Sequence, residues 1–226
     1  MQTLGGAMVT IEQRRARMVS EQLARRGIDD ESVLDAFGRV PREEFVDPTF
    51  ERYAYDDGPL AIGYGQTISQ PYVVAMTVEA LALQGHERVL EVGTGSGYAA
   101  AILGLLAREV DTIERIPELA AIATERLARL GLSNVHVHCA DGTLGWPPNA
   151  PYEAICVAAG APRPPQPLLD QLAIGGRLVL PFGDASSQHL VRIIRRDEKS
   201  FVDEDLGEVR FVPLVGAAGW PAEQRT

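Results

Sequence analysis

The chain has 226 residues, of which 46% are hydrophobic and 23% are charged, and this composition excludes a disordered or fibrous protein. Its 21 Lys and Arg residues and 31 Asp and Glu residues give a formal net charge of −10. Because an acidic surface repels phosphate groups at long range, we expect no nucleic-acid partner unless a local basic patch offsets this charge. The length favours one domain.

Two cysteines, Cys139 and Cys156, are too few for a disulfide framework and form no Cys-x-x-Cys pair. They favour a reducing cytosol, and we expect both thiols to be buried. Residues 1–10 lack the basic and apolar regions of a signal peptide. The longest apolar run, 98–107, has ten residues, whereas a membrane span needs about 20. We therefore predict a cytoplasmic protein without a membrane partner; no pattern indicates its oligomeric state.

The first third of the chain predicts helices around one long irregular stretch. Residues 1–9 carry no periodic pattern, whereas apolar residues at helical spacing predict helices over 11–26 and 31–40. Residues 41–72 are rich in glycine and proline and lack periodicity; a loop of this length is often functional. A helix is expected over 73–83. The arginines of the first helix are expected to form a solvated face rather than a patch for an anionic partner; they are Arg14, Arg15, Arg17, Arg25 and Arg26.

From residue 88 onward, strands and helices alternate, which predicts a mainly parallel sheet with helices on both faces. The expected strands are 88–92, 110–114, 135–140, 153–159 and 177–180, and the expected helices are 98–107, 117–130 and 167–172. Strands 189–196 and 209–215 follow without a helix between them, so an antiparallel hairpin should close the sheet. We predict a doubly wound α/β fold in a single domain over 1–226, with N-terminal helices and a loop over 11–83 and an α/β core over 88–216.

A glycine-rich turn, EVGTGSG at 91–97, joins the expected strand 88–92 to the next helix. Glycine permits a tight turn and the close approach of a ligand, and a helix N-terminus offers unpaired N–H groups. Ligands of open α/β sheets bind at the carboxyl ends of the strands, so we expect a ligand here. The dinucleotide pattern GxGxxG fails at its last position, Tyr98, and the Gly-Lys-Ser/Thr of a phosphate loop is absent.

Acidic residues follow the next two strands. Glu114 lies 21 residues after Gly93, where a carboxylate can accept hydrogen bonds from ribose hydroxyls. Asp141 follows the third strand, where a carboxylate could meet an adenine amino group. Glu114 alone could be a helix cap, but the three strand ends together suit a nucleoside with a non-phosphorylated tail. His136 and His138 are expected to pack in the sheet, and we predict no metal site.

This set of strand ends resembles class I S-adenosylmethionine-dependent methyltransferases. Two segments, IGYGQTISQP at 62–71 and VPREEFV at 40–46, are similar to the protein-L-isoaspartate O-methyltransferase family. Further similar blocks lie at 151–155, 175–181 and 210–214. The resemblance extends from about residue 11 to residue 216, and the segment at 62–71 is more specific than the glycine motif.

The resemblance implies transfer of a methyl group from S-adenosylmethionine to the α-carboxylate of L-isoaspartyl residues in damaged proteins and peptides. The ester then closes to a succinimide, which begins repair. Ser69 matches the active-site serine of the family and would orient the substrate carboxylate, with Thr67 beside it and residues 56–71 as a substrate-facing lid. A turn hydroxyl bonded to its own backbone is the alternative for Ser69. The residues assigned to the cofactor are Glu91, Gly93, Gly95, Ser96, Glu114, Arg115, Asp141 and Gly142.

The reaction needs no protein nucleophile, which agrees with the absence of a GxSxG elbow around Ser69. A carboxylate with a pKa near 3.9 is already ionised at neutral pH, and a sulfonium donor leaves as a neutral group. What remains is alignment of the reacting atoms in a site that excludes water.

Three other functions compete with repair. A tailoring enzyme could form an aspartimide in one dedicated peptide, but it would be expected to carry an extra recognition region, and about ten residues follow Gly216. An RNA base methyltransferase is disfavoured by the net charge and by the absence of an Asn/Asp-Pro-Pro-Tyr/Phe motif. A cofactor-binding module without catalysis would be expected to have lost the pattern at 62–71, which is intact.

Overall fold

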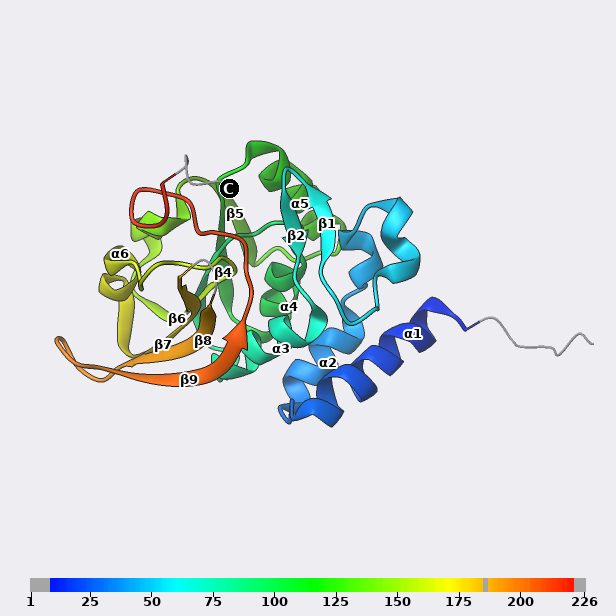
Figure 1. The fold of residues 1–226 in the computed structure, drawn as a ribbon, viewed down its shortest axis with the longest axis horizontal. Coiled ribbons are helices and arrows are strands. Elements are labelled where there is room, and N and C mark those ends of the chain that lie inside the picture. The colour runs from blue at the N-terminus through cyan, green and yellow to red at the C-terminus, as the bar shows by residue number, and fades with distance from the viewer. Residues whose placement is uncertain (1–8, 185–186, 222–226) are drawn as a thin grey trace, which may run out of the picture.

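A seven-stranded sheet forms the centre of the computed structural model, which describes residues 9–184 and 187–221 (Figure 1). The strand order is β5-β4-β3-β6-β7-β8-β9. Strands β3 to β7 are parallel to one another, and β8 and β9 are antiparallel, as the sequence predicts. The strands are β3 (Arg88–Val92), β4 (Glu109–Glu114), β5 (Val135–Cys139), β6 (Tyr152–Val157), β7 (Leu172–Gly183), β8 (Gln188–Arg195) and β9 (Phe201–Val209).

Helices cover both faces of this sheet, which confirms the doubly wound α/β class. Successive side chains of a strand point to opposite faces, so Val89 and Leu90 of β3 belong to two different apolar clusters. The first cluster joins the sheet to α3 (Pro71–Ala80), α4 (Tyr98–Leu106) and α5 (Pro117–Arg129), with α1 (Ile11–Arg17) and α2 (Glu31–Arg39) outside them. The second cluster includes Leu168 of α6 (Gln166–Asp170).

The first helix is less regular than its sequence predicts. The expected helix over 11–26 divides into α1, a π-helical turn at Met18–Leu23 and a 3-10 turn at Ala24–Arg26. A π-turn changes the direction of the side chains that follow it, and here both Met18 and Leu23 reach the core. The second helix agrees with its prediction. It begins after Asp30, whose carboxylate accepts hydrogen bonds from two N–H groups of the first turn.

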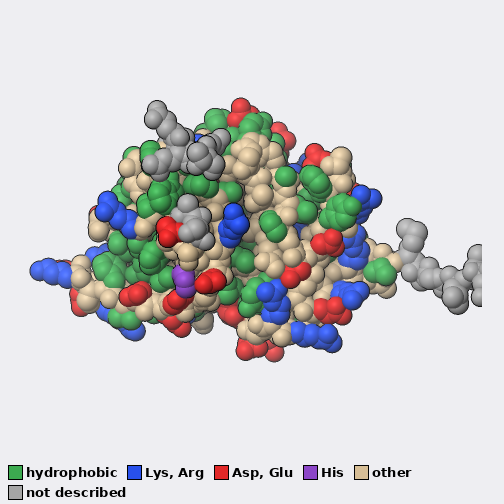
Figure 2. All heavy atoms as spheres, viewed as in Figure 1, with side chains coloured by type: hydrophobic (Ala, Val, Ile, Leu, Met, Phe, Trp, Pro, Cys, Tyr) green, Lys and Arg blue, Asp and Glu red, His purple; other side chains and the backbone are tan. Residues whose placement is uncertain are grey.

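Three of the five arginines in the predicted helix over 11–26 form ion pairs with carboxylates. Arg15 lies 2.9 Å from Glu43, and Arg26 lies 3.0 Å from Asp57. Figure 2 shows blue and red side chains close together on this side of the molecule. Ion pairs of Arg15, Arg17 and Arg26 therefore balance much of the positive charge locally, which disfavours a bare basic patch, but the Arg15 side chain is only 16% exposed and so is not part of a solvated face.

The stretch over 41–72 contains regular elements that the sequence did not predict. Two 3-10 segments, Arg42–Phe45 and Pro48–Tyr53, precede a hairpin of β1 (Leu60–Gly63) and β2 (Gln66–Ile68), and α3 begins two residues earlier than expected. Strands of four and three residues are too short to show alternation. The hairpin turns at Gly63, Tyr64 and Gly65, whose φ angles are 88°, 54° and 68°.

The predicted strand over 209–215 is wrong. The last strand is β9, and residues 210–215 form an irregular segment at the carboxyl edge of the sheet. Strand β9 lies at the edge of the sheet and carries acidic residues that face solvent, so its apolar pattern is weak. Strand β7 is also longer than the predicted 177–180, because it begins at Leu172, where the sequence predicts the end of a helix.

Within the described residues, no helix combines the length and the apolar character that crossing a membrane requires. Residues 1–8, part of the N-terminal stretch predicted to be irregular, lie outside the described ranges, as do 185–186 and 222–226. Cys156 is buried as expected, whereas Cys139, at the end of β5, is exposed, which corrects the expectation for that thiol.

Gly97 closes the glycine turn with a φ of 91°, and a Cβ there would lie 3.3 Å from the Cβ of Ala123 on α5. We expect Gly97→Ala to lower the free energy of unfolding by roughly 1–3 kcal/mol, because an L side chain is strained in this conformation. Urea unfolding measures the change. Gly38→Ala is the matched control. Gly38 lies in α2 with open space around it, so this substitution should leave the free energy of unfolding unchanged or raise it. Equal effects of the two substitutions would contradict the prediction.

Candidate active site

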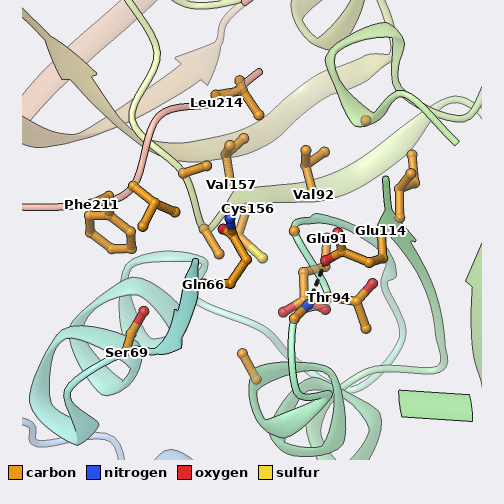
Figure 3. Close-up of a pocket in the computed structure, with 18 of the residues that line it drawn as sticks. Gln66, Ser69, Glu91, Val92, Thr94, Glu114, Cys156, Val157, Phe211 and Leu214 are labelled. Atoms are coloured by element: carbon orange, nitrogen blue, oxygen red, sulfur yellow. Dashed lines mark hydrogen bonds between the residues drawn. The ribbon is translucent and has the colours of Figure 1, made fainter. Parts of the chain in front are cut away.

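A cavity of about 1070 Å³, counting the part that is open to solvent, lies at the carboxyl edge of the sheet (Figure 3). Strands β3 and β6 are neighbours there, although the chain adds β4 and β5 on one side before it returns to β6. The wall comes from the hairpin and the turn after it, from α3 and α4, from the ends of β3, β4 and β6, from the turn at Gly142 and from the segment at 211–215. Labelled lining residues in Figure 3 are Gln66, Ser69, Glu91, Val92, Thr94, Glu114, Cys156, Val157, Phe211 and Leu214.

The glycine turn after β3 forms the floor of this cavity. Gly93 and Gly95 have φ angles of 97° and 53°. A Cβ on Gly93 would touch Ala158 at the end of β6, and a Cβ on Gly95 would touch Ile62 of the hairpin, each at 3.4 Å. Glycine is therefore needed at both positions for the backbone angles, whereas a Cβ would make only ordinary van der Waals contacts with the two neighbouring segments.

Glu114 ends β4 beside this turn. One carboxylate oxygen accepts a hydrogen bond from the Gly95 N–H at 2.9 Å, and the other accepts one from the Ile116 N–H at 3.0 Å. The side chain is buried and lines the cavity, so its carboxylate is fixed next to the glycine floor. Ser96, which is buried, and Arg115, which is exposed, line the cavity as well.

Glu91 stands at the bottom of the cavity with an incomplete set of partners. Its Oε2 accepts a hydrogen bond from the Thr112 hydroxyl at 2.5 Å, while its buried Oε1 has no hydrogen-bond partner. Burial raises the pKa of Glu91 to about 8, against the effect of the Thr112 hydrogen bond and with a further increase from Glu114. A buried carboxylate oxygen without a partner, in the wall of a cavity, suits a cationic ligand.

Asp141 and Gly142 are placed differently from one another. Gly142 lines the cavity, and a Cβ there would lie 2.5 Å from Val92, so the position accepts only glycine without rearrangement. The Asp141 carboxylate instead accepts hydrogen bonds from the Thr143 N–H and hydroxyl and from the Ala217 N–H. Burial opposes ionisation, but these bonds outweigh it and lower the pKa of Asp141. Asp141 thus ties two turns together, and its contact with an adenine amino group stays a prediction.

Thr67, in β2, and Ser69, in the turn before α3, lie on the other side of the cavity. Figure 3 shows Ser69 far across the cavity from Glu114. Both residues also line an outer groove with Pro59, Val73 and Arg210. Across residues 9–184 and 187–221 the Ser69 hydroxyl has no hydrogen-bond partner, so the alternative of a hydroxyl bonded to its own turn is wrong.

Several cavity residues were absent from the predicted site. Gln66, Phe211 and Leu214 line the cavity, as does Cys156, whose pKa is raised by burial. The only signal for Phe211 and Leu214 was the family-like block at 210–214, which the sequence predicts as a strand rather than as a cavity wall. Cys156 sits on a buried strand and carries no pattern that separates it from a core residue.

The two histidines of β5 serve packing and hydrogen bonding. His138 lies 2.7 Å from the buried Asp111 and stacks on Trp146, and His136 lies 3.3 Å from Glu109. The described part of the chain contains no group of three or more His, Cys, Asp or Glu residues that could hold a metal ion.

Neutralising Glu91 should stabilise the ligand-free protein in alkaline solution. A carboxyl group whose pKa rises from 4.5 to about 8 binds a proton on folding, so the free energy of unfolding falls as the pH rises between these values. Even half of that shift corresponds to about 2 kcal/mol, or roughly 4–8 °C in melting temperature. Glu91→Gln should therefore melt higher than wild type above pH 8 and gain little near pH 4.5. Thermal melts across this range measure the difference. The exposed Glu198→Gln is the control, and a gain independent of pH would refute the prediction.

Comparison with known proteins identifies the family of the chain. The family model for protein-L-isoaspartate(D-aspartate) O-methyltransferase matches residues 13–219. A Marinobacter nauticus protein named protein-L-isoaspartate O-methyltransferase 2 is 58% identical over 208 residues, which cover 92% of this chain and 95% of that one.

Two solved structures are similar over most of the chain. One, named protein-L-isoaspartate O-methyltransferase, has a TM-score of 0.81 and 31% identity, and the match covers 91% of this chain and 67% of that one. The other, a Plasmodium falciparum protein of the same description in complex with S-adenosyl-L-homocysteine, has a TM-score of 0.77 and 27% identity, and the match covers 88% of this chain and 96% of that one. The chain belongs to the protein-L-isoaspartate(D-aspartate) O-methyltransferase family.

Proposed function

We propose that this protein transfers a methyl group from S-adenosylmethionine to the α-carboxylate of L-isoaspartyl residues in damaged proteins and peptides. The observation that carries the proposal is one cavity with two chemically different sides. Glu91 and Glu114 face it from the sheet, and the unpaired Ser69 hydroxyl faces it from the turn before α3. Membership of the family supports the same reaction.

The residues of the sheet side fit S-adenosylmethionine. The molecule carries positive charge on its sulfonium and amino groups, and the unpartnered Oε1 of Glu91 would accept such a cation. Glu114 would receive the ribose hydroxyls, and the turn at Gly142 would border the adenine, with Asp141 holding that turn. When bound, S-adenosylmethionine supplies an electrophilic methyl group on a sulfur that leaves without charge.

Ser69 would supply orientation rather than proton transfer. The substrate carboxylate is ionised at neutral pH and needs no base. A hydrogen bond from the Ser69 hydroxyl would hold one carboxylate oxygen and leave the other directed at the cavity. Apolar residues such as Phe211 and Leu214 limit water in the same space. Charge is consumed in the reaction, and a dry environment favours that change.

Esterification converts the α-carboxylate into a neutral, electrophilic ester whose methoxy group can leave. The neighbouring backbone nitrogen then attacks the ester carbonyl, loses its proton and expels methanol as the succinimide closes. Hydrolysis of the succinimide returns part of the damaged protein to a normal aspartyl linkage. The partners are accordingly damaged proteins and peptides, and the two unpaired cysteines agree with a cytoplasmic location.

The two parts of the chain divide the work in this proposal. Residues 11–83 contribute the substrate side through Thr67 and Ser69, with 56–71 as the lid. Residues 88–216 contribute the cofactor side. The Ile62 side chain lies 3.4 Å from where a Cβ on Gly95 would be, and this proximity supports a lid that lies over the cofactor turn.

Methyl transfer from labelled S-adenosylmethionine to a short isoaspartyl peptide, beside the matching aspartyl peptide, tests the function. Base-labile label on the isoaspartyl peptide only is the expected result. Label on neither peptide, with S-adenosylhomocysteine binding intact, would exclude general repair and favour a single dedicated peptide substrate.

Ser69→Ala should reduce kcat/KM for the isoaspartyl peptide by roughly 10- to 100-fold, the size expected for one hydrogen bond to a charged group. Its affinity for S-adenosylhomocysteine should not change, because the cofactor side remains whole. Steady-state kinetics and calorimetric titration measure the two quantities. Ser133→Ala, an exposed serine just before β5, is the control and should behave as wild type. Full activity of Ser69→Ala would remove Ser69 from the mechanism.

A further inference from the structure

Arg42 is a fully buried cation directly behind Ser69. Its Nε donates a hydrogen bond to the Ala54 carbonyl at 2.8 Å, and its Nη2 donates one to the Ser69 carbonyl at 2.7 Å. Its third nitrogen, Nη1, has no hydrogen-bond partner. None of the carboxylates in residues 9–184 and 187–221 forms an ion pair with this guanidinium.

This arrangement lowers the free energy of unfolding. A buried charge is normally paired, because removal from water costs several kcal/mol that only an opposite charge recovers. Burial lowers the pKa of Arg42, but the ordinary pKa of arginine is so high that the guanidinium stays protonated. A neutral side chain could hold the same carbonyl groups without this cost, so hydrogen bonding alone does not explain the positive charge.

The positive charge of Arg42 is weakly screened, because aromatic side chains surround it. The guanidinium carbon lies 4.8 Å from the centre of the Tyr98 ring, which packs edge-on against Phe37 and Phe45. Tyr98 begins α4 and lines the active-site cavity. Arg42 therefore lies between the turn that carries Ser69 and an aromatic wall of the cavity, where charges interact more strongly than in water.

We propose that Arg42 is the counter-charge of the substrate carboxylate and a positioning residue that acts through Ser69. It holds the Ser69 peptide by hydrogen bonding, and its positive charge attracts the anion that the Ser69 hydroxyl orients. The missing partner of Arg42 is thus the substrate itself. The methyl ester that forms is neutral and loses this attraction, which favours release of the product. This inference rests on the proposed function.

Comparison of a charged with a neutral ligand separates this role from a structural one. With S-adenosylhomocysteine present, calorimetry would give the affinities of an isoaspartyl peptide and of its α-carboxamide counterpart. Arg42→Gln should weaken binding of the charged peptide by roughly 10- to 50-fold and leave that of the amide almost unchanged. In turnover, KM should rise more than kcat falls. Arg42→Lys keeps the charge and should retain most of the preference.

Arg177→Gln is the matched control. Arg177 also donates hydrogen bonds to two backbone carbonyls, those of Leu81 and Ala82, but it has Glu87 as a partner and lies near the amino ends of β3 and β6. The Arg177→Gln variant should be less stable than wild type but should bind the charged peptide with the same preference over the amide. If Arg42→Gln weakened the binding of the charged peptide and of the amide equally, Arg42 would have a merely structural role and the proposal would be overturned.

The wild-type protein gives a second test that does not depend on the folding of a variant. A buried charge is little affected by salt, so the preference for the charged peptide should persist from about 0.1 M to about 1 M salt, while the Debye length falls from about 10 to about 3 Å. It should also persist in part in Ser69→Ala. Loss of the preference at high salt would assign it to the exposed Arg115 and Arg210 and overturn the proposal. Binding is measured without turnover, so an enzyme that binds but does not methylate isoaspartyl peptides would contradict the proposed function separately.

Discussion

Between β3 and β6 the chain reverses the direction in which it adds strands, and the loops that leave these two strands separate to opposite faces of the sheet. This leaves space at the carboxyl edge that the backbone itself does not fill. The glycine turn enters that space from β3, and Ala158 limits it from β6. Glu114 then fixes the turn through the Gly95 N–H. The glycine turn and Glu114 thus form the fixed side of the cavity, and the other parts of the site lie around them.

The site contains two buried ionisable side chains, one acidic and one basic, and each has an incomplete set of partners. Glu91 lacks a cation on the sheet side, and Arg42 lacks an anion behind Ser69. Each incomplete set matches one of two reactants of opposite charge. A protein that orients such groups in advance spends folding free energy on them, and it needs little reorganisation when the reactants arrive. The cost falls on stability and the benefit on binding, as is common in enzyme sites.

The core of the fold was predictable because its signals are local. Strands β3 and β6 are short, largely apolar runs, and the glycines at 93, 95 and 97 follow the first of them directly. The hairpin β1–β2 and the edge strand β9 were missed, since the former is too short and the latter too acidic to show an apolar pattern. Asp141 was assigned by position alone, and only coordinates reveal that Thr143 and Ala217 occupy its carboxylate. The burial of Arg42 depends on residues distant in sequence, so VPREEFV at 40–46 marked the family without indicating a role.

The cavity wall combines Gln66 and Ser69 from the first third of the chain with Phe211 and Leu214 from its last part. Contacts of such sequence separation form late, because closing a long loop costs entropy before the contact rewards it. The catalytic space therefore exists only after both regions have docked on the sheet. A reactant in that space bridges them, so it acts as a clamp on the folded state and slows the local opening that exposes a chain to proteolysis. A repair enzyme built in this way is itself best protected from proteolysis while a reactant fills the cavity.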